Sequence, residues 1–272
     1  MLMVDRARRL LDASGFAYRD LRAFEVGSQH HLFRLVGVHD GKPYVLKIGR
    51  VGDPFGDAWD PHRQHLSGLK AEAQAVSLVR RVDAPTPSRI LSETEPSALM
   101  PHLPGESGQS LWDRRRLDEQ GLQDLCFAMG GAMAAIHSRK RPEDPGDVPD
   151  LPLPDFDPAK ARLLHMDFHL GNVQVVRDRV RGMYQVRGVV DWVLCRWGPR
   201  EADLVELSIS VFRQLPAARG SFMAGYRRAG GLVFDQAQEK RFTLLELQRR
   251  LPLAPNEKVR TNWRTWIGEL TS

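Results

Sequence analysis

Cysteine and long hydrophobic runs are the scarcest features of this 272-residue chain. Its two cysteines, Cys126 and Cys195, have neither CxxC spacing nor the density of a disulfide-linked secreted domain, so we expect ordinary core residues in a reducing compartment. No apolar run approaches the roughly 18 residues that a membrane helix needs. The first 15 residues mix charged and apolar side chains, unlike the apolar centre of a signal peptide. These absences favour a cytoplasmic protein without a membrane partner.

Lysine is also scarce, although the chain is basic. It supplies seven of the 39 basic residues, and the formal net charge is +5. No dense Lys/Arg run is interleaved with aromatic residues in the way that would follow a nucleic-acid backbone, so we expect no nucleic-acid partner. Hydrophobic residues make up 42% of the chain, which is enough for sizeable cores, and the length favours two lobes. The oligomeric state is left open.

The N-terminal third predicts a small sheet with helices. Residues 4–13 form an amphipathic helical pattern, and alternation over residues 24–50 predicts two or three antiparallel strands, with a hairpin turn at 39–42. Residues 50–67 are rich in Gly, Asp, Pro and His and are expected to form an exposed loop. A helix over 69–82 and two short strands within 88–102 would complete this part.

The remainder is mostly helical in pattern. We expect a long helix over 122–137, interrupted at Gly130 and Gly131, then a Pro/Asp-rich loop over 141–158. Apolar runs at 173–176 and 186–190 predict a hairpin, and several helices follow from residue 201.

The most informative segment lies within this second part. Residues 165–172, here called the HxD loop, place His165, Asp167 and Asn172 in an H-x-D-x-x-x-x-N arrangement between apolar runs. Such a loop can aim a carboxylate at an acceptor hydroxyl while an amide five residues later holds a metal ion beside donor phosphates. We therefore predict phosphoryl transfer, with Asp167 as the catalytic base and Asn172 as a Mg²⁺ ligand. His165 would brace the loop backbone through hydrogen bonds.

Phosphoryl transfer also needs a cation on the donor phosphates. Lys47, in the predicted strand YVLKI, could supply it, and Glu72 on the next helix could hold its ammonium group toward the phosphates. Taken singly, a strand lysine is more often a surface residue and a helix glutamate is an ordinary solvated one, so the prediction depends on the two occurring together. Gly27 and Ser28, between the first strands, would let backbone N–H groups approach phosphate oxygens, or would simply form a tight turn.

Further downstream, two acidic residues have candidate roles. Asp191 ends an apolar strand, where a carboxylate needs a cation or hydrogen-bond donors, so we predict a second metal ligand; the alternative is a turn cap. Asp203 lies in the first turn of the following helix and could accept N–H bonds from the HxD loop; the alternative is helix capping. His169 could face the substrate or be structural.

Together these residues resemble the aminoglycoside phosphotransferase and choline kinase superfamily, the small-molecule branch of the protein-kinase-like fold. The resemblance extends over residues 24–226 and is carried by HMDFHLGN at 165–172, Asp191-Trp192, GPREADL at 198–204, AMGGAMAAIHS at 128–138 and LMPHLPGE at 99–106. It implies ATP or GTP as donor, Mg²⁺, and phosphorylation of a hydroxyl group on a small molecule. Met166 stands where Gly is usual in this family, and Leu170 where Pro is usual.

The C-terminal region gives one indication about the acceptor. Family members that act on polycationic drugs usually build an acidic pocket there, and this chain has Glu246, Glu257 and Glu269. Nearby arginines should largely offset their charge, so we expect a neutral or weakly charged hydroxyl compound.

The sequence thus predicts an α+β, bilobal protein-kinase-like fold, with a small antiparallel-sheet N-lobe bearing a helix and a mainly helical C-lobe. We divide the chain into a nucleotide-binding N-lobe (1–100), a hinge (101–108) and a C-lobe with the catalytic loop and acceptor site (109–272). The predicted enzyme acts on a small molecule, and an antibiotic is one candidate. The alternatives are a non-catalytic kinase-like nucleotide-binding module, or a metabolic kinase for choline-, sugar- or homoserine-like alcohols. A protein kinase is disfavoured because D-F-G and A-P-E motifs are missing.

Overall fold

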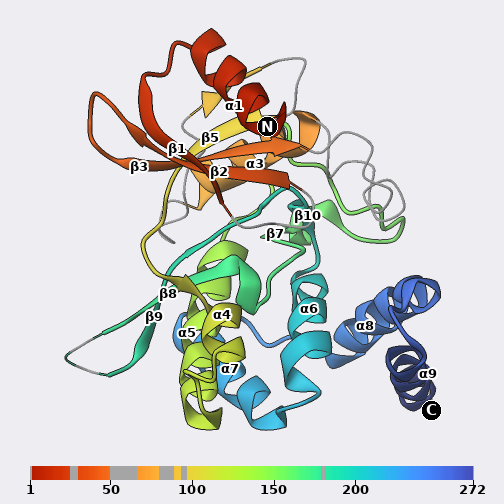
Figure 1. The fold of residues 1–272 in the computed structure, drawn as a ribbon. Helices are drawn as coiled ribbons and strands as arrows, with labels where there is room; N and C mark the ends of the chain where they lie inside the picture. Colours follow the sequence, from red (N-terminus) through yellow and green to blue (C-terminus); the bar gives the residue numbers. More distant parts are fainter. Residues whose placement is uncertain are drawn as a thin grey trace.

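The computed structural model describes residues 2–24, 30–49, 66–79, 89–92, 97–178, 180 and 182–271. A mainly β N-terminal part lies against a mainly helical C-terminal part (Figure 1). This arrangement confirms the α+β class predicted from the sequence.

The N-terminal part begins with helix α1 (Leu2–Ala13) and strands β1 (Tyr18–Phe24), β2 (His30–Gly37) and β3 (Pro43–Gly49). The turn predicted at 39–42 joins β2 to β3, as expected. The prediction was wrong in starting the strands at residue 24. Strand β1 was not predicted because its side chains do not alternate regularly. Its register shifts between Arg19 and Arg22, and Asp20 has φ 56°.

Two further strands complete the sheet. β4 (Arg89–Ile90) and β5 (Ser97–Pro101) add to it in the order β1-β2-β3-β5-β4, and all its pairings are antiparallel. Between β3 and β4 lies helix α3 (Leu66–Leu78), which begins three residues before the predicted start. The predicted end, residues 80–82, falls outside the described residues, as does most of the predicted loop at 50–67.

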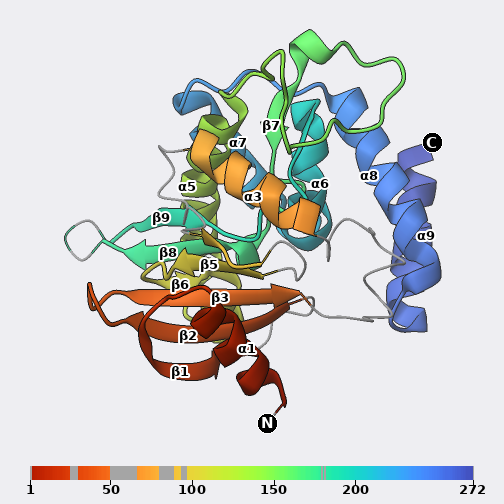
Figure 2. The ribbon, with the colours of Figure 1, turned by 90° about the horizontal axis from the view of Figure 1, so that it is seen from above.

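Helix α3 connects the two parts of the molecule. In Figure 2 it passes across the helices of the C-terminal part, with the sheet to one side. Ala71, Ala75 and Val76 belong to the main core of the C-terminal part. Leu69 instead packs with Ala98 of β5 in a smaller cluster. Both apolar faces of α3 are therefore covered, which fixes its position relative to the sheet.

The C-terminal part contains helices, short 3₁₀ turns and two small sheets. Its elements are α4 (Gly108–Asp113), α5 (Glu119–His137), β7 (Arg162–Leu164), β8 (Val173–Arg177), β9 (Tyr184–Val189), β10 (Arg196–Gly198), α6 (Val205–Leu207), α7 (Pro216–Arg228), α8 (Gln236–Arg250) and α9 (Glu257–Thr271). The predicted hairpin is present as β8 and β9, and helices follow residue 201 as predicted.

Helix α5 runs unbroken through Gly130 and Gly131, contrary to the predicted interruption. The reason is packing against α7. A Cβ at Gly130 would overlap the carbonyl oxygen of Phe222, and one at Gly225 would overlap that of Phe127. These two glycines let the helix backbones approach closely, so they serve the crossing of α5 and α7.

Residues 101–108, the predicted hinge, contain strand β6 (Glu106–Ser107), which pairs with β8. Ser107 also caps α4 by accepting the N–H of Ser110 at 3.1 Å. The segment thus enters the C-terminal part as ordered structure. The division of the chain into lobes at these residues stays a prediction.

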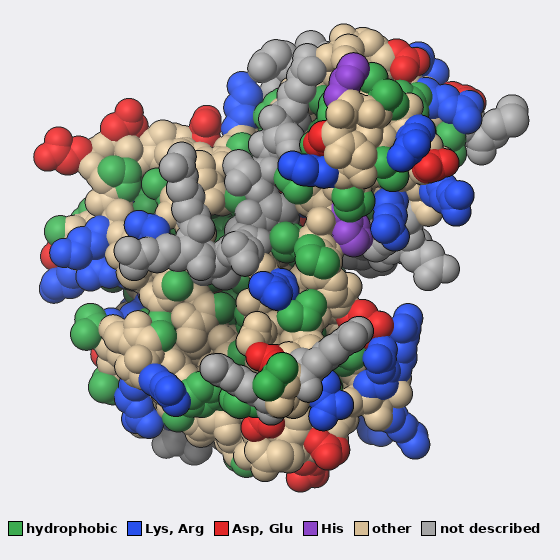
Figure 3. All heavy atoms as spheres, turned by 90° about the vertical axis from the view of Figure 1, so that its left-hand side faces the viewer, with side chains coloured by type: hydrophobic (Ala, Val, Ile, Leu, Met, Phe, Trp, Pro, Cys, Tyr) green, Lys and Arg blue, Asp and Glu red, His purple; other side chains and the backbone are tan. Residues whose placement is uncertain are grey.

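Among the described residues, none of the helices combines the length and hydrophobicity that crossing a bilayer requires. On the face seen in Figure 3, basic side chains lie in several separate groups with acidic ones between them.

Candidate active site

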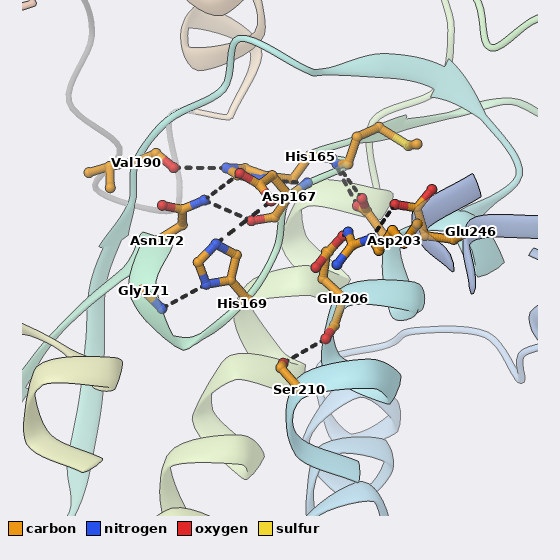
Figure 4. Close-up of polar contacts among 12 residues, drawn as sticks. His165, Asp167, His169, Gly171, Asn172, Val190, Asp203, Glu206, Ser210 and Glu246 are labelled. Carbon is orange, nitrogen blue, oxygen red and sulfur yellow. Dashed lines mark hydrogen bonds and ion pairs between the residues drawn. The ribbon is translucent and has the colours of Figure 1, made fainter. Parts of the chain in front are cut away.

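The HxD loop leaves β7 and enters β8 through a short 3₁₀ turn at Leu170–Asn172. Both strands are held from outside the loop, since β7 pairs with β10 and β8 pairs with β9. The ends of the loop are therefore fixed by two separate sheets. Figure 4 shows the polar side chains that gather around it.

His165 is fully buried and braces the loop, as the sequence predicts for it. Its Nδ1 accepts the N–H of Asp167 at 3.2 Å, so the ring proton resides on Nε2 and is donated to the carbonyl oxygen of Val190 at 2.9 Å. Burial lowers the pKa of His165 below its ordinary 6.5, which favours this neutral tautomer. The ring connects the loop to the strand end that precedes Asp191.

Asp203 holds the start of the loop. Its carboxylate accepts the backbone N–H of His165 at 2.8 Å and that of Met166 at 2.5 Å. Met166 has φ 65°, a left-handed conformation that suits glycine better than a side chain, which explains why glycine is usual at this position in the resembled family. The two hydrogen bonds keep the backbone in that conformation.

A buried relay supports Asp203 from behind. His137, the last residue of α5, contacts Asp203 Oδ2 through Nε2 at 3.0 Å and the hydroxyl of Tyr226 through Nδ1 at 2.9 Å. Sequence analysis assigned no role to His137 or Tyr226. The available signal was a polar residue ending an otherwise apolar helix, which needs a buried partner.

Asp167 is positioned by its neighbours in the loop. The amide nitrogen of Asn172 donates to the backbone carbonyl of Asp167 at 2.9 Å and to its Oδ2 at 3.1 Å. His169 accepts the N–H of Gly171 at Nδ1, so its Nε2 carries the proton and faces Asp167 Oδ1 at 3.7 Å. The Asp167 side chain remains 21% exposed, and a ligand can therefore reach it.

The second cluster joins both parts of the molecule. Lys47 on β3 donates to Glu72 of α3 at 3.2 Å and to Asp191 at 2.6 Å. Glu72 also accepts the backbone N–H of Trp192 at 3.0 Å through its other oxygen. The predicted contact between Lys47 and Glu72 is thus present, and Asp191 joins it.

Charge stabilises this cluster. Burial alone would lower the pKa of Lys47, but the attraction of Asp191 and Glu72 outweighs it and raises the pKa. The ammonium group is therefore retained at neutral pH in a position where Lys47 is only 4% exposed.

Asp191 of this cluster and the nearby Asn172 carry oxygen atoms that suit a divalent cation. The side chain of Asp191 is 31% exposed. The N–H of Val190 donates to the backbone carbonyl of Asn172 at 2.9 Å, so residues 172 and 191, which are well separated in sequence, lie close together in space. Because the amide nitrogen of Asn172 is used by Asp167, its carbonyl oxygen is the atom available to a ligand. Carboxylate and amide oxygens suit Mg²⁺. Within the described residues, no three His, Cys, Asp or Glu side chains form a further metal-binding group.

The predicted phosphate-binding positions Gly27 and Ser28 lie outside the described residues.

A cavity of about 640 Å³ opens beside Met166. Its lining comes from residues 149–153, from the helical segment containing Glu206, and from α8, which contributes Glu246 and Arg250. Arg250 forms ion pairs with both glutamates. Sequence analysis missed Glu206 and Arg250, since they lie 44 positions apart and no motif joins them.

The three C-terminal glutamates are each paired with arginine. Glu246 pairs with Arg249 and Arg250, Glu257 with Arg260 and Arg264, and Glu269 with Arg213. The expected offset of their charge is therefore present in the structure.

Comparisons with known proteins agree with this geometry. The model of the phosphotransferase enzyme family matches residues 148–240, which include the HxD loop and Asp191. No curated protein matches the chain. The chain is similar in structure to aminoglycoside phosphotransferase APH(4)-Ia, with a TM-score of 0.61, 14% identity, and coverage of 99% of this chain and 98% of the other.

Two further solved structures have the same fold. Spectinomycin phosphotransferase APH(9)-Ia, solved with ADP and spectinomycin, gives a TM-score of 0.57 at 15% identity, covering 97% of this chain and 93% of the other. A putative fructosamine-3-kinase from Thermobifida fusca YX-ER1 gives 0.59 at 17% identity, covering 98% and 97%. A phosphotransferase family model thus matches the part of the chain that carries the HxD loop, and the whole chain has the fold of these phosphotransferase and kinase structures.

Proposed function

We propose that the chain transfers the γ-phosphoryl group of ATP or GTP, in the presence of Mg²⁺, to a hydroxyl group of a small molecule. The observation that carries this proposal is the contact of Lys47 with both Glu72 and Asp191. Asp191 is 144 residues from Lys47 in sequence and lies next to the HxD loop. A buried ammonium group shared by two carboxylates is costly to build and serves phosphate binding once a nucleotide is present.

On the donor side, Lys47 binds the phosphates and Glu72 fixes its direction. Backbone N–H groups at Gly27 and Ser28 would cover the phosphates, as expected from the sequence. Asn172 and Asp191 would hold Mg²⁺, which neutralises phosphate charge when it is bound. To hold the ion, Asp191 would give up its ion pair with Lys47. Solved relatives in complex with ADP and with AMP-PNP support a nucleotide donor.

On the acceptor side, Asp167 orients the hydroxyl group and accepts its proton as the oxygen attacks the γ-phosphorus. The bond from that phosphorus to the bridging oxygen breaks, and the nucleoside diphosphate leaves. His165 and Asp203 keep the loop backbone in place during this step, and they do so through hydrogen bonds that do not require them to change protonation.

The acceptor belongs to one of two biological settings, which share one site architecture. Relatives solved with spectinomycin and with hygromycin B support an antibiotic and a role in resistance. The likeness to a putative fructosamine-3-kinase supports a metabolite. In either setting, the use of a nucleotide donor supports a cytoplasmic location.

Two substitutions test the proposal separately. Asp167→Asn should lower kcat by about 10²–10⁴-fold while Mg²⁺-ATP still raises the melting temperature. Asp191→Ala should remove that Mg²⁺-dependent rise. Asp113→Asn, an exposed substitution on α4, is the matched control and should leave both unchanged.

The alternative is a kinase-like module that binds nucleotide without transferring phosphate. A nucleotide-consumption screen over amino sugars, macrolides, nucleoside antibiotics, choline-like alcohols, sugars and homoserine distinguishes the two. Binding of Mg²⁺-ATP without consumption beyond background for any acceptor would support the module.

A further inference from the structure

The cavity beside Met166 is lined by equal numbers of acidic and basic side chains. Its charged lining consists of three carboxylates and three guanidinium groups, from Asp150, Glu206, Glu246, Arg196, Arg249 and Arg250. The other ten lining residues are apolar: Pro149, Leu151, Pro152, Leu153, Met166, Leu194, Ala202, Val205, Phe242 and Leu245. The cavity therefore has no net charge, and most of its lining is hydrophobic.

Arg250 forms ion pairs with two of the three carboxylates. It is the last residue of α8, and its Nε donates to Glu246 at 2.6 Å while its Nη2 donates to Glu206. The side chains of Arg250 and Glu206 are only 13% and 15% exposed. One guanidinium group thus bridges two carboxylates that come from different helical segments.

Glu206 lies next to the reacting groups. Figure 4 shows it between the HxD loop and Glu246. Burial raises the pKa of Glu206, Arg250 opposes this rise, and Asp167 adds to it. Glu206 lines the same cavity as Met166, the residue before Asp167. An ammonium group of an acceptor bound beside Asp167 would therefore seek Glu206 as its partner.

Glu206 already forms an ion pair with Arg250. A cationic acceptor would have to displace Arg250, and the displaced guanidinium would lose two charge-assisted hydrogen bonds in a partly buried place. An uncharged hydroxyl compound needs no such exchange and gains from the apolar lining.

We propose that Arg250 acts as a built-in substitute for an acceptor's cation, and that the acceptor is an uncharged hydroxyl compound with a large apolar surface. This rests on the proposed phosphotransferase function and specifies the acceptor class of the same site. It assigns a specificity-determining role to Arg250 and Glu206.

Small probes test the proposal without requiring turnover. Arg250→Met removes the guanidinium group and keeps an unbranched side chain, so Glu206 loses its ion pair and can bind a cation, while Glu246 keeps its ion pair with Arg249. Binding of n-butylguanidinium and n-butylamine, followed by calorimetry, should become at least tenfold tighter than in the unmodified protein, whereas binding of n-butanol should not. Arg249→Met is the matched control, because Arg249 pairs with Glu246 at the more exposed edge. Adding Glu206→Gln to Arg250→Met should abolish the gain.

The unmodified protein gives an independent answer if Arg250→Met does not fold. It should bind n-butanol at least as tightly as n-butylamine, and in the nucleotide-consumption screen it should accept uncharged apolar alcohols in preference to amine-bearing ones. Tighter binding of the amine, or a lower KM for a polycationic aminoglycoside, overturns the assignment of Arg250. Absence of turnover with every acceptor instead contradicts the proposed function, while the probe measurements still decide the role of Arg250.

Discussion

Replacing Asp203 by asparagine should destabilise the protein and disable the HxD loop. The carboxylate is buried and accepts two backbone N–H groups, from His165 and Met166, together with a contact from His137. An asparagine of the same shape must turn its NH₂ group toward one of these N–H donors. At least one hydrogen bond to a charged group is lost, and one buried N–H is left unsatisfied.

The expected cost follows from those two effects. A hydrogen bond to a charged group contributes about 1.5–3 kcal/mol, and an orphaned buried donor costs about 1–3 kcal/mol, so that Asp203→Asn should lower the free energy of unfolding by about 3 kcal/mol. For a chain of this size that corresponds to a fall in Tm of roughly 6–12 °C. The positive φ of Met166 would also lose its support, so kcat should fall even at temperatures where the variant is folded.

Thermal unfolding by circular dichroism and steady-state kinetics at 20 °C check this prediction. Asp235→Asn is the control, because Asp235 caps α8 at an exposed position with the same kind of backbone contacts. A Tm within 2 °C of the unmodified protein, together with unchanged kcat, would refute the reasoning that Asp203 holds the loop.

Three further predictions concern packing, thiol chemistry and pH. Gly130→Ala should lower the free energy of unfolding by about 1–3 kcal/mol, because the added methyl group overlaps the backbone of α7. Gly131 has open space around it, so Gly131→Ala should raise the free energy of unfolding by about 0.5–1 kcal/mol. Urea unfolding measures both changes. Burial raises the pKa of Cys126 to about 12 and that of Cys195 further, so iodoacetamide at pH 8 should label neither until the chain is denatured. Because burial lowers the pKa of His165, folding is opposed increasingly as pH falls below 6.5; Tm should drop between pH 7 and pH 5.5, less so in His165→Gln.

Local sequence patterns were enough to predict much of the fold. Alternating residues in β2 and β3, the turn between them, and the apolar runs of β8 and β9 predicted elements that the structure confirms, because each pattern reflects contacts close along the chain. Strand β1 was missed because a register shift breaks its alternation. The unbroken course of α5 through Gly130 was missed because its cause lies on another helix.

The candidate site divides in the same way. The spacing of His165, Asp167 and Asn172 is local, so the sequence by itself determined the HxD loop and the class of chemistry it predicts. The tertiary structure alone decided that Lys47 contacts Asp191, that His137 supports Asp203 and that Arg250 bridges Glu206 and Glu246. These contacts join side chains that are far apart in sequence, and a buried charge is stable only beside the partner that the folded chain brings to it.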